Sequence, residues 1–398
     1  MPKKLSCIFF CNSLMLMIFA FLLSCAETIE PKIPPMGQES FEQYRLETIE
    51  WIRKHRNFQT EDIEEEILWN APKEWLPANE SRKRGILLVH GLGNSPWDFI
   101  DIAPVLAANN FLVRAILLAG CGTKPSDLIH VTLDDWRRQI SEQVAILSRE
   151  VEEVFLGGFS AGANLVLEYA INNPEIKGLL LLSPAIKTRI PLDFMAPILS
   201  RFTTWLVNTR THPMQLPHRY LAVPTNALNQ FFHSRASARF LLRKNPYTRP
   251  VLIVQTKHDH IVNSRYVLRL FDSRFTNPNS RLIWYGEIPD RMEVSSRVLV
   301  RPDYLPEWRI SQFSHISILF SPENEAFGRG GSQRMCWNGQ TQEDYELCLL
   351  GAEVWYSDWG FREPGKIHAR LTFNPYFDWQ SEIMMEVLNS RSCAMNES

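Results

Sequence analysis

The chain has 398 residues, a length that allows two or three average domains or one large α/β domain with insertions. Hydrophobic residues make up 45% of it and charged residues 22%, which is ordinary globular composition and excludes wholesale disorder. The 42 Lys and Arg against 44 Asp and Glu leave no basic excess for a nucleic-acid partner. A protein with several membrane spans is also excluded, because the sequence contains only one long apolar run.

That apolar run lies at the N-terminus. Lys3 and Lys4 precede a mostly apolar stretch that ends in LLSC at 22–25, which predicts a secretory signal over residues 1–24. The Ser-Cys pair resembles a bacterial lipobox, in which Cys25 is diacylated and becomes the new N-terminus. An uncleaved signal anchor and plain cleavage are the alternatives. Residues 25–37 contain three prolines and are predicted to be a tether.

These features predict a lipid-anchored protein of the bacterial cell envelope. Ala26 stands after the cysteine in place of Asp, and by resemblance to enteric lipoproteins this favours the outer membrane. An exported chain enters an oxidising compartment. Cys336 and Cys348 flank a polar loop, so we expect them to form a disulfide, although two unpaired thiols are the alternative.

Buried strand-like runs alternate with helical patterns through the middle of the chain. This alternation predicts an α/β fold with a mostly parallel central sheet and helices on both faces. The expected strands are 85–91, 111–120, 151–158, 176–184, 250–259 and 281–288, and the expected helices are 98–109, 133–151 and 161–173.

Other segments lie outside this alternation. A helix is predicted at 39–57, an early strand at 62–69 and a closing helix at 380–389. The apolar, proline-interrupted segment 187–250 is predicted to be a helical lid inserted into a single domain spanning 38–398. A second insertion, 289–312, is expected to be irregular, and 321–375 receives no assignment.

The pentapeptide Gly158-Phe159-Ser160-Ala161-Gly162 matches G-x-S-x-G, the nucleophile elbow. An apolar strand precedes it and a helix follows, which is the context that this turn requires. The turn is so tight that side chains two residues either side of the serine would collide, so both positions need glycine. Ser160 is therefore the predicted nucleophile, and an incidental serine in a glycine-rich turn is the alternative.

A serine hydroxyl needs a base and an orienting carboxylate, which follow it in the order acid, then histidine in this fold. Asp259 lies just past the strand that follows the insertion, whereas the rival carboxylates Asp272 and Asp290 lie further along. His315 lies in a loop after the last expected strand and is the predicted base. His368 comes later, within a possible strand.

His258 and His260 flank the acid. A metal site on this His-Asp-His sequence is disfavoured, because adjacent side chains point in different directions and no third ligand cluster is evident. We therefore expect no metal and no cofactor.

Charge developing on a substrate carbonyl oxygen requires backbone N–H donors. The N–H of Ala161, directly after the nucleophile, is one expected donor. The N–H of Leu92, in the loop after the first core strand, is the other. His90 precedes that donor and is interpreted as a residue that braces the loop rather than as a base.

The segments HGLGNSP (90–96) and GCGTKP (120–125), Trp136, GFSAG (158–162) and Ser314-His315 together resemble a branch of the α/β-hydrolase superfamily. This is the bacterial esterase, monoacylglycerol-lipase-like or serine aminopeptidase-like branch. The resemblance covers about 85–320 and implies a triad of Ser160, Asp259 and His315 acting on a small-molecule carboxylic ester. Cys121 departs from the usual residue in its loop.

Seven apolar residues of the insertion are expected mainly to pack on the sheet, with some lining an acyl pocket: Phe194, Met195, Ile198, Leu199, Phe202, Trp205 and Leu206. A monoacylglycerol, a lysophospholipid or a short acyl ester fits equally well. The alternatives are a peptidase or acyltransferase with the same triad, and a non-catalytic envelope lipoprotein.

Overall fold

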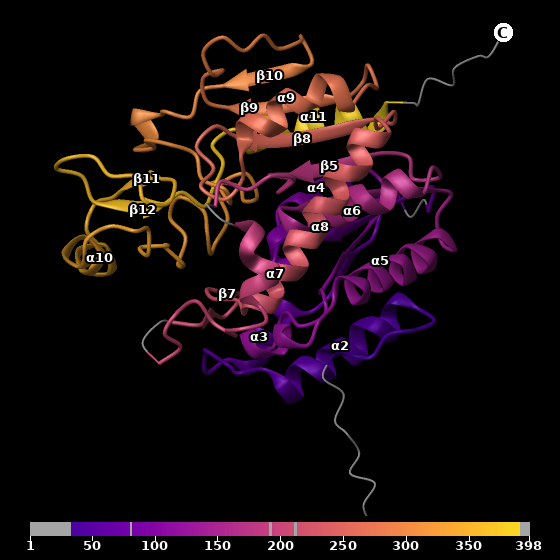
Figure 1. The fold of residues 1–398 in the computed structure, drawn as a ribbon, viewed down its shortest axis with the longest axis horizontal. Helices are drawn as coiled ribbons and strands as arrows, with labels where there is room; N and C mark the ends of the chain where they lie inside the picture. Colours follow the sequence, from indigo (N-terminus) through magenta and orange to yellow (C-terminus); the bar gives the residue numbers. More distant parts are fainter. Residues whose placement is uncertain (1–32, 80–81, 191–192, 211–212, 391–398) are drawn as a thin grey trace, which may run out of the picture. The chain divides into compact units, whose positions relative to one another are not determined.

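The central sheet has eight strands within the residues that the computed structural model describes, 33–79, 82–190, 193–210 and 213–390 (Figure 1). The strand order is β1-β3-β2-β4-β5-β8-β9-β10, and only β1 runs antiparallel to its neighbour. The strands are β1 Lys73–Trp75, β2 Arg84–Val89, β3 Phe111–Ile116, β4 Glu153–Phe159, β5 Leu179–Leu182, β8 Val251–Thr256, β9 Arg281–Tyr285 and β10 Val298–Arg301. The signal segment, Cys25 and most of the predicted tether lie outside the described residues.

Side chains of each central strand alternate between two apolar cores, one on each face of the sheet. In β2, Leu87 and Val89 belong to one core while Ile86 and Leu88 belong to the other. The first core is covered by α2 Phe41–His55, α5 Leu133–Ser148, α6 Ala161–Asn172, α8 Thr225–Lys244 and α9 Ser264–Arg274. The second core is covered by α4 Ile102–Ala108 and α11 Phe377–Asn389. The predicted α/β class is confirmed.

Residues 62–69, predicted as a strand, form a helix instead: α3, Ile63–Asn70. Asp62 caps its N-terminus by accepting a hydrogen bond from the N–H of Glu65, and three glutamates occupy the first turn. Caps and acidic residues in this position stabilise a helix N-terminus. The strand prediction was wrong because it followed the apolar residues and overlooked these signals.

The insertion 187–250 contains α7 Ala196–Leu199, the hairpin β6 Gln215–Leu216 and β7 Arg219–Tyr220, and the long helix α8, which packs against α6 (Figure 1). The expectation that its apolar residues pack mainly on the sheet is wrong. None of the seven is buried, and Phe202 is 82% exposed.

The second insertion, 289–312, is more regular than expected, because residues 298–301 form the edge strand β10 alongside β9. The unassigned segment 321–375 contains α10 Gln342–Leu349, β11 Trp355–Ser357 and β12 His368–Arg370, which form a group at one side of the sheet (Figure 1). A disulfide joins Cys336 and Cys348, the pair expected to bond. No helix in the described part of the chain is long and apolar enough to cross a membrane.

Candidate active site

Ser160 occupies the turn between β4 and α6, at the carboxyl edge of the sheet. Its φ of 54° and ψ of -110° are strained for a residue with a side chain. The backbone on both sides is fixed, since Ser160 N–H donates to the carbonyl of Leu182 and its own carbonyl accepts from Ala185. Strain of this kind persists where the surrounding structure over-determines the conformation, and such positions cluster at functional sites.

The two glycines of the pentapeptide leave room for this turn. A Cβ on Gly158 would lie 2.5 Å from the carbonyl carbon of Gly162. A Cβ on Gly162 would lie 2.0 Å from the carbonyl oxygen of Val89, at the end of β2. The first turn of α6 therefore packs directly against the loop that follows β2, which is possible only without side chains at these positions.

His315 and Asp259 continue a hydrogen-bonded line from the serine. Nε2 of His315 lies 3.0 Å from Oγ of Ser160, and its Nδ1 lies 2.6 Å from Oδ2 of Asp259. With the proton on Nδ1, His315 donates to the carboxylate and accepts from the hydroxyl. Ser160 follows β4, Asp259 follows β8 and His315 lies in the loop after β10. These strands all end at the same edge of the sheet.

The Asp259 carboxylate is completely buried and has further partners. Its Oδ1 accepts from the N–H groups of Ile261 at 2.9 Å and Val262 at 2.7 Å. Gln255 donates to Oδ2 at 3.2 Å. Burial acts to raise the pKa of Asp259, but the neighbouring His315 and the N–H of Val262 outweigh it, so the pKa lies below the ordinary value. The carboxyl group is thus held as a carboxylate.

The loop after β2 lies beside the serine. A Cβ on Gly91 would lie 3.0 Å from the Phe159 ring, so the two segments are packed together. Leu92 directly follows Gly91, and Ala161 lies two residues after Phe159. His90 braces this loop, because Nδ1 contacts the carbonyl of Gly91 at 2.7 Å while Nε2 accepts from the N–H of Leu118 at 3.0 Å. Burial lowers the pKa of His90 to about 4, so this ring stays neutral.

The rival residues lie elsewhere. The carboxylate of Asp272 accepts hydrogen bonds from Ser295 and Arg297. Nε2 of His258 lies 3.5 Å from Oδ2 of Asp303. His368, in β12, lies 3.6 Å from Glu363. None of these bonds involves the serine. Among the described residues, no group of three or more His, Cys, Asp or Glu side chains is arranged to hold a metal ion.

Two contributions to the site were not foreseen. His260 lies with its ring 6.3 Å from that of His315, and its Nδ1 is 2.8 Å from Oδ1 of Asp358. Tyr220, from the insertion hairpin, donates its N–H to the carbonyl of Gly93 at 2.7 Å and so holds the loop after β2. Asp358 and Tyr220 come from segments without recognisable patterns, so no sequence signal marked them.

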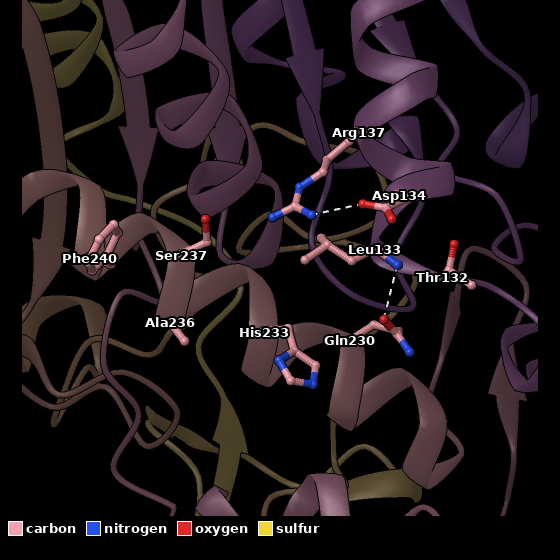
Figure 2. A pocket seen from close by; sticks show the side chains of 9 residues that line it. All are labelled: Thr132, Leu133, Asp134, Arg137, Gln230, His233, Ala236, Ser237 and Phe240. Atoms are coloured by element: carbon pink, nitrogen blue, oxygen red, sulfur yellow. Dashed lines mark hydrogen bonds and ion pairs between the residues drawn. The ribbon is translucent and has the colours of Figure 1, made fainter.

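Two hollows lie near the insertion. One, of about 260 Å³, is lined mainly by apolar residues of α7, α8 and the chain around them: Ile190, Met195, Leu199, Leu206, Leu228 and Phe231. The other, of about 520 Å³, lies between the start of α5 and α8, where Arg137 bonds Asp134 and Gln230 accepts from the N–H of Leu133 (Figure 2). This second hollow is polar in part and includes none of the three aligned residues.

The parallel sheet, the strained serine turn and the serine–histidine–carboxylate line define the protein as an α/β-hydrolase. The family described as serine aminopeptidase, S33, matches residues 80–288, and the chain belongs to this family. The matched range includes Ser160 and Asp259. His315 and the segment 321–375 lie beyond it.

The chain is similar to known lipolytic enzymes. A thermostable monoacylglycerol lipase of Bacillus sp. (strain H-257) is 27% identical over 180 residues, which is 45% of this chain and 71% of that protein. A carboxylesterase of Bacillus subtilis (strain 168) is 22% identical over 208 residues, which is 51% of this chain and 83% of that protein. The structure of a Paleococcus ferrophilus monoacylglycerol lipase is 20% identical, covers 54% of this chain and 87% of that chain, and gives a TM-score of 0.43.

Proposed function

We propose that the protein is a serine hydrolase that cleaves carboxylic esters, lipid-like esters above all, through an acyl-enzyme. The observation that carries the proposal is the line from Asp259 through His315 to Ser160, with the serine on a strained turn. The lipase and carboxylesterase among its relatives favour an ester over other acyl substrates.

In this mechanism His315 takes the proton of Ser160 as the hydroxyl attacks the ester carbonyl. The N–H groups of Leu92 and Ala161 stabilise the oxyanion. His315 then protonates the leaving alcohol and activates the water that releases the acid. Asp259 stays ionised throughout and orients the imidazole, which the lowered pKa of its carboxyl group supports.

The insertion supports a lipid-like substrate. Residues of α7 and α8 line its apolar hollow of about 260 Å³, and the exposed side chains of Phe194 and Phe202 lie on the same segment. Exposed apolar groups of this kind suit contact with an aggregated lipid. We assign the segment the role of a lid that closes over an acyl chain.

An aminopeptidase would need a free carboxylate to hold the α-amine of its substrate. Asp98 already accepts from Asn94 and from the N–H of Gly91, and Asp358 is bonded to His260. Neither carboxylate is free for this role. The lipase and the carboxylesterase among the relatives favour ester hydrolysis over the peptidase alternative. An acyltransferase has no specific observation in its favour.

The test is release of p-nitrophenol from acyl esters of two to sixteen carbons. The wild-type protein is compared with Ser160→Ala and with Ser273→Ala, whose hydroxyl lies on the exposed side of α9. We expect turnover in the wild type and in Ser273→Ala but not in Ser160→Ala. Equal turnover in all three proteins would refute the proposal.

We also propose that Cys25 anchors the enzyme to the cell envelope through a lipid. The support is the LLSC sequence after an apolar run. Mass spectrometry of the mature N-terminal peptide tests this. A diacylglycerol mass on Cys25 is expected, and an unmodified Cys25 would exclude the anchor.

A further inference from the structure

The insertion 187–250 differs in charge from the rest of the chain. It carries ten Lys and Arg residues and one carboxylate, Asp193, and no Asp or Glu occurs from Phe194 to His258. The whole chain has 42 Lys and Arg against 44 Asp and Glu, so the residues outside the insertion are acidic overall. A positive region on an otherwise acidic protein attracts an anionic partner.

The positive side chains of the insertion are not neutralised by carboxylates. Six of them are exposed: Lys187, Arg189, Arg201, Arg210, Arg243 and Lys244. Within the part of the chain that the structure describes, no ion pair joins any of these six to an Asp or Glu. Two of them contact neutral groups, since Arg189 donates to the carbonyl of Asp259 at 3.3 Å and Lys187 lies 5.0 Å from the centre of the Tyr266 ring.

Exposed apolar side chains lie on the same segment. Phe194, Ile198 and Phe202 are 59%, 53% and 82% exposed. The chain there is helical, because the 3-10 turn Asp193–Met195 leads directly into α7. A spacing of four residues therefore places the three side chains on one side of the helix. Leu199, on the other side, lines the apolar hollow.

α8 connects the charged groups with the apolar ones, since it packs against α7 (Figure 1). Phe232 and Arg235 line the hollow together with α7, and Arg239 and Arg243 continue this row at helical spacing. Nη1 of Arg239 donates to the carbonyl of Ile186 at 3.3 Å, so the start of the insertion lies against the same row. We call this surface the basic–apolar face, and its exposed members include Lys187, Phe194, Ile198, Arg201, Phe202 and Arg243.

A lipid bilayer with anionic headgroups would use both features of this face. The apolar side chains would enter the boundary of the acyl region, while the positive groups would stay at the level of the phosphates. A nucleic acid would pair with the charges but would leave the exposed phenylalanines in water. The combination therefore fits a membrane surface better than a polyanion.

The basic–apolar face also leads to the candidate active site. Thr188 lines the apolar hollow and forms a β-bridge with Val262, whose N–H donates to the carboxylate of Asp259. A lipid that leaves the bilayer at this face would thus enter the hollow beside the loop that carries the acid.

We propose that the basic–apolar face docks the enzyme on a membrane surface that contains anionic phospholipids. The inference rests on the proposed function for the purpose of this contact, which is the delivery of a lipid-like ester to Ser160. The contact itself is separate from the proposed anchor at Cys25 and needs no turnover.

The experiment is sedimentation of residues 33–398 with vesicles. This part forms one compact unit that holds both cores and the three aligned residues. It lacks Cys25 and the apolar run, whose own affinity for lipid would hide that of the insertion. Vesicles of phosphatidylcholine alone are compared with vesicles in which about one-third of the lipid is phosphatidylglycerol. We expect the dissociation constant for the anionic vesicles to be about tenfold lower or more, and to rise with added salt.

Two pairs of substitutions remove the two features separately. Arg201→Gln with Arg243→Gln should weaken binding to the anionic vesicles by about tenfold, because each positive side chain near an anionic surface strengthens binding. Phe194→Ser with Phe202→Ser should weaken binding by about tenfold as well, because apolar burial is lost. All four side chains are exposed, so the fold should persist.

Each pair has a matched control. Arg53→Gln with Arg138→Gln removes the same charge from α2 and α5, where both arginines pair with carboxylates. Leu349→Ser with Leu350→Ser removes two apolar side chains that are 59% and 84% exposed at the end of α10. Both controls should bind the anionic vesicles as the unchanged protein does.

Equal affinity for the two kinds of vesicle, or unchanged affinity in both test variants, would overturn the docking site. A second copy of this chain is the other occupant to test, by analytical ultracentrifugation without lipid. A dimer that Phe194→Ser with Phe202→Ser dissociates, combined with no vesicle binding, would overturn the proposal and assign the face to that second copy.

Failure of this inference and failure of the proposed function are distinguishable. Vesicle binding needs no turnover, so Ser160→Ala should bind as the unchanged protein does. Vesicle binding without hydrolysis of any ester would contradict the proposed function alone. Hydrolysis of soluble p-nitrophenyl esters without vesicle binding would contradict only the docking site.

Discussion

Oδ2 of Asp259 lies 2.6 Å from Nδ1 of His315, although 56 residues separate the two in the chain. The carboxylate is completely buried and receives two backbone N–H bonds on its other oxygen. This arrangement fixes both the orientation and the tautomer of the imidazole. The carboxylate thus has its full set of partners before any substrate binds.

The first prediction concerns this pair. Asp259→Asn should lower kcat by about three to four orders of magnitude, because the amide favours the wrong tautomer of His315. The fold should persist, since an asparagine oxygen can still accept from Val262. Steady-state kinetics with a p-nitrophenyl ester measures the change, and full activity in the variant would show that another residue is the acid.

The second prediction concerns the close approach at the serine turn. Gly162→Ala should lower the free energy of unfolding by about 3 kcal/mol or more, because the new methyl group meets the carbonyl oxygen of Val89. Gly330→Ala is the control, since a Cβ there has no neighbour within 4 Å. Urea unfolding of both variants checks this, and similar losses in the two would contradict the packing argument.

The third prediction concerns a buried ion pair that holds the insertion hairpin. Nε of Arg56 lies 2.7 Å from Oε1 of Glu66, and other N–H groups of Arg56 donate to the carbonyls of Gly122 and Pro217. Arg56→Met should destabilise the protein by about 3–5 kcal/mol, because it leaves the Glu66 charge buried without its partner.

The control is Arg53→Met, which removes an exposed pair between Arg53 of α2 and Glu64 of α3. Exposed pairs contribute little, so this variant should unfold close to wild type. Chemical denaturation measures both proteins. Equal stability of the two variants would mean that the buried pair does not hold the hairpin.

The fourth prediction is a pH dependence. The pKa of His90 is about 4 in the folded protein against an ordinary 6.5, so between these values only the unfolded state binds the proton. Stability from this residue is therefore present above about pH 6.5 and is lost as the pH falls towards about 4. The stability advantage of wild type over His90→Asn should shrink by about 2–3 kcal/mol across this window. Urea titrations near pH 6.5 and near pH 4 measure this advantage. The same advantage at both pH values would contradict a neutral His90 that braces the loop.

The fifth prediction concerns the disulfide. Replacing Cys336 and Cys348 by alanine opens a loop with a sequence separation of 12 and should cost about 2–3 kcal/mol. A reducing agent should destabilise the wild type by a similar amount and leave the double variant unchanged. Thermal unfolding with and without reductant measures this, and no effect on the wild type would contradict a structural role.

The sequence predicted the six inner strands of the sheet, but not its edge strands β1 and β10. It predicted these strands and the aligned residues because both depend on short local patterns. Ser160 lies in a pentapeptide whose glycines are dictated by the turn, and Asp259 and His315 follow in an order set by the topology. Tyr220 and Asp358 were not predicted, because they reach the site through packing between distant segments. The exposure of Phe202 was also missed, since apolar composition predicts burial.

The nucleophilic role of Ser160 is tested most directly by covalent labelling with a fluorophosphonate, followed by mass spectrometry of the peptides. We expect one adduct, on Ser160, in the wild-type protein, and no adduct in Ser160→Ala. Labelling should be slower in Asp259→Asn, because His315 then activates the hydroxyl poorly. An adduct on a different residue, or equal labelling of Ser160→Ala, would show that Ser160 is not the nucleophile.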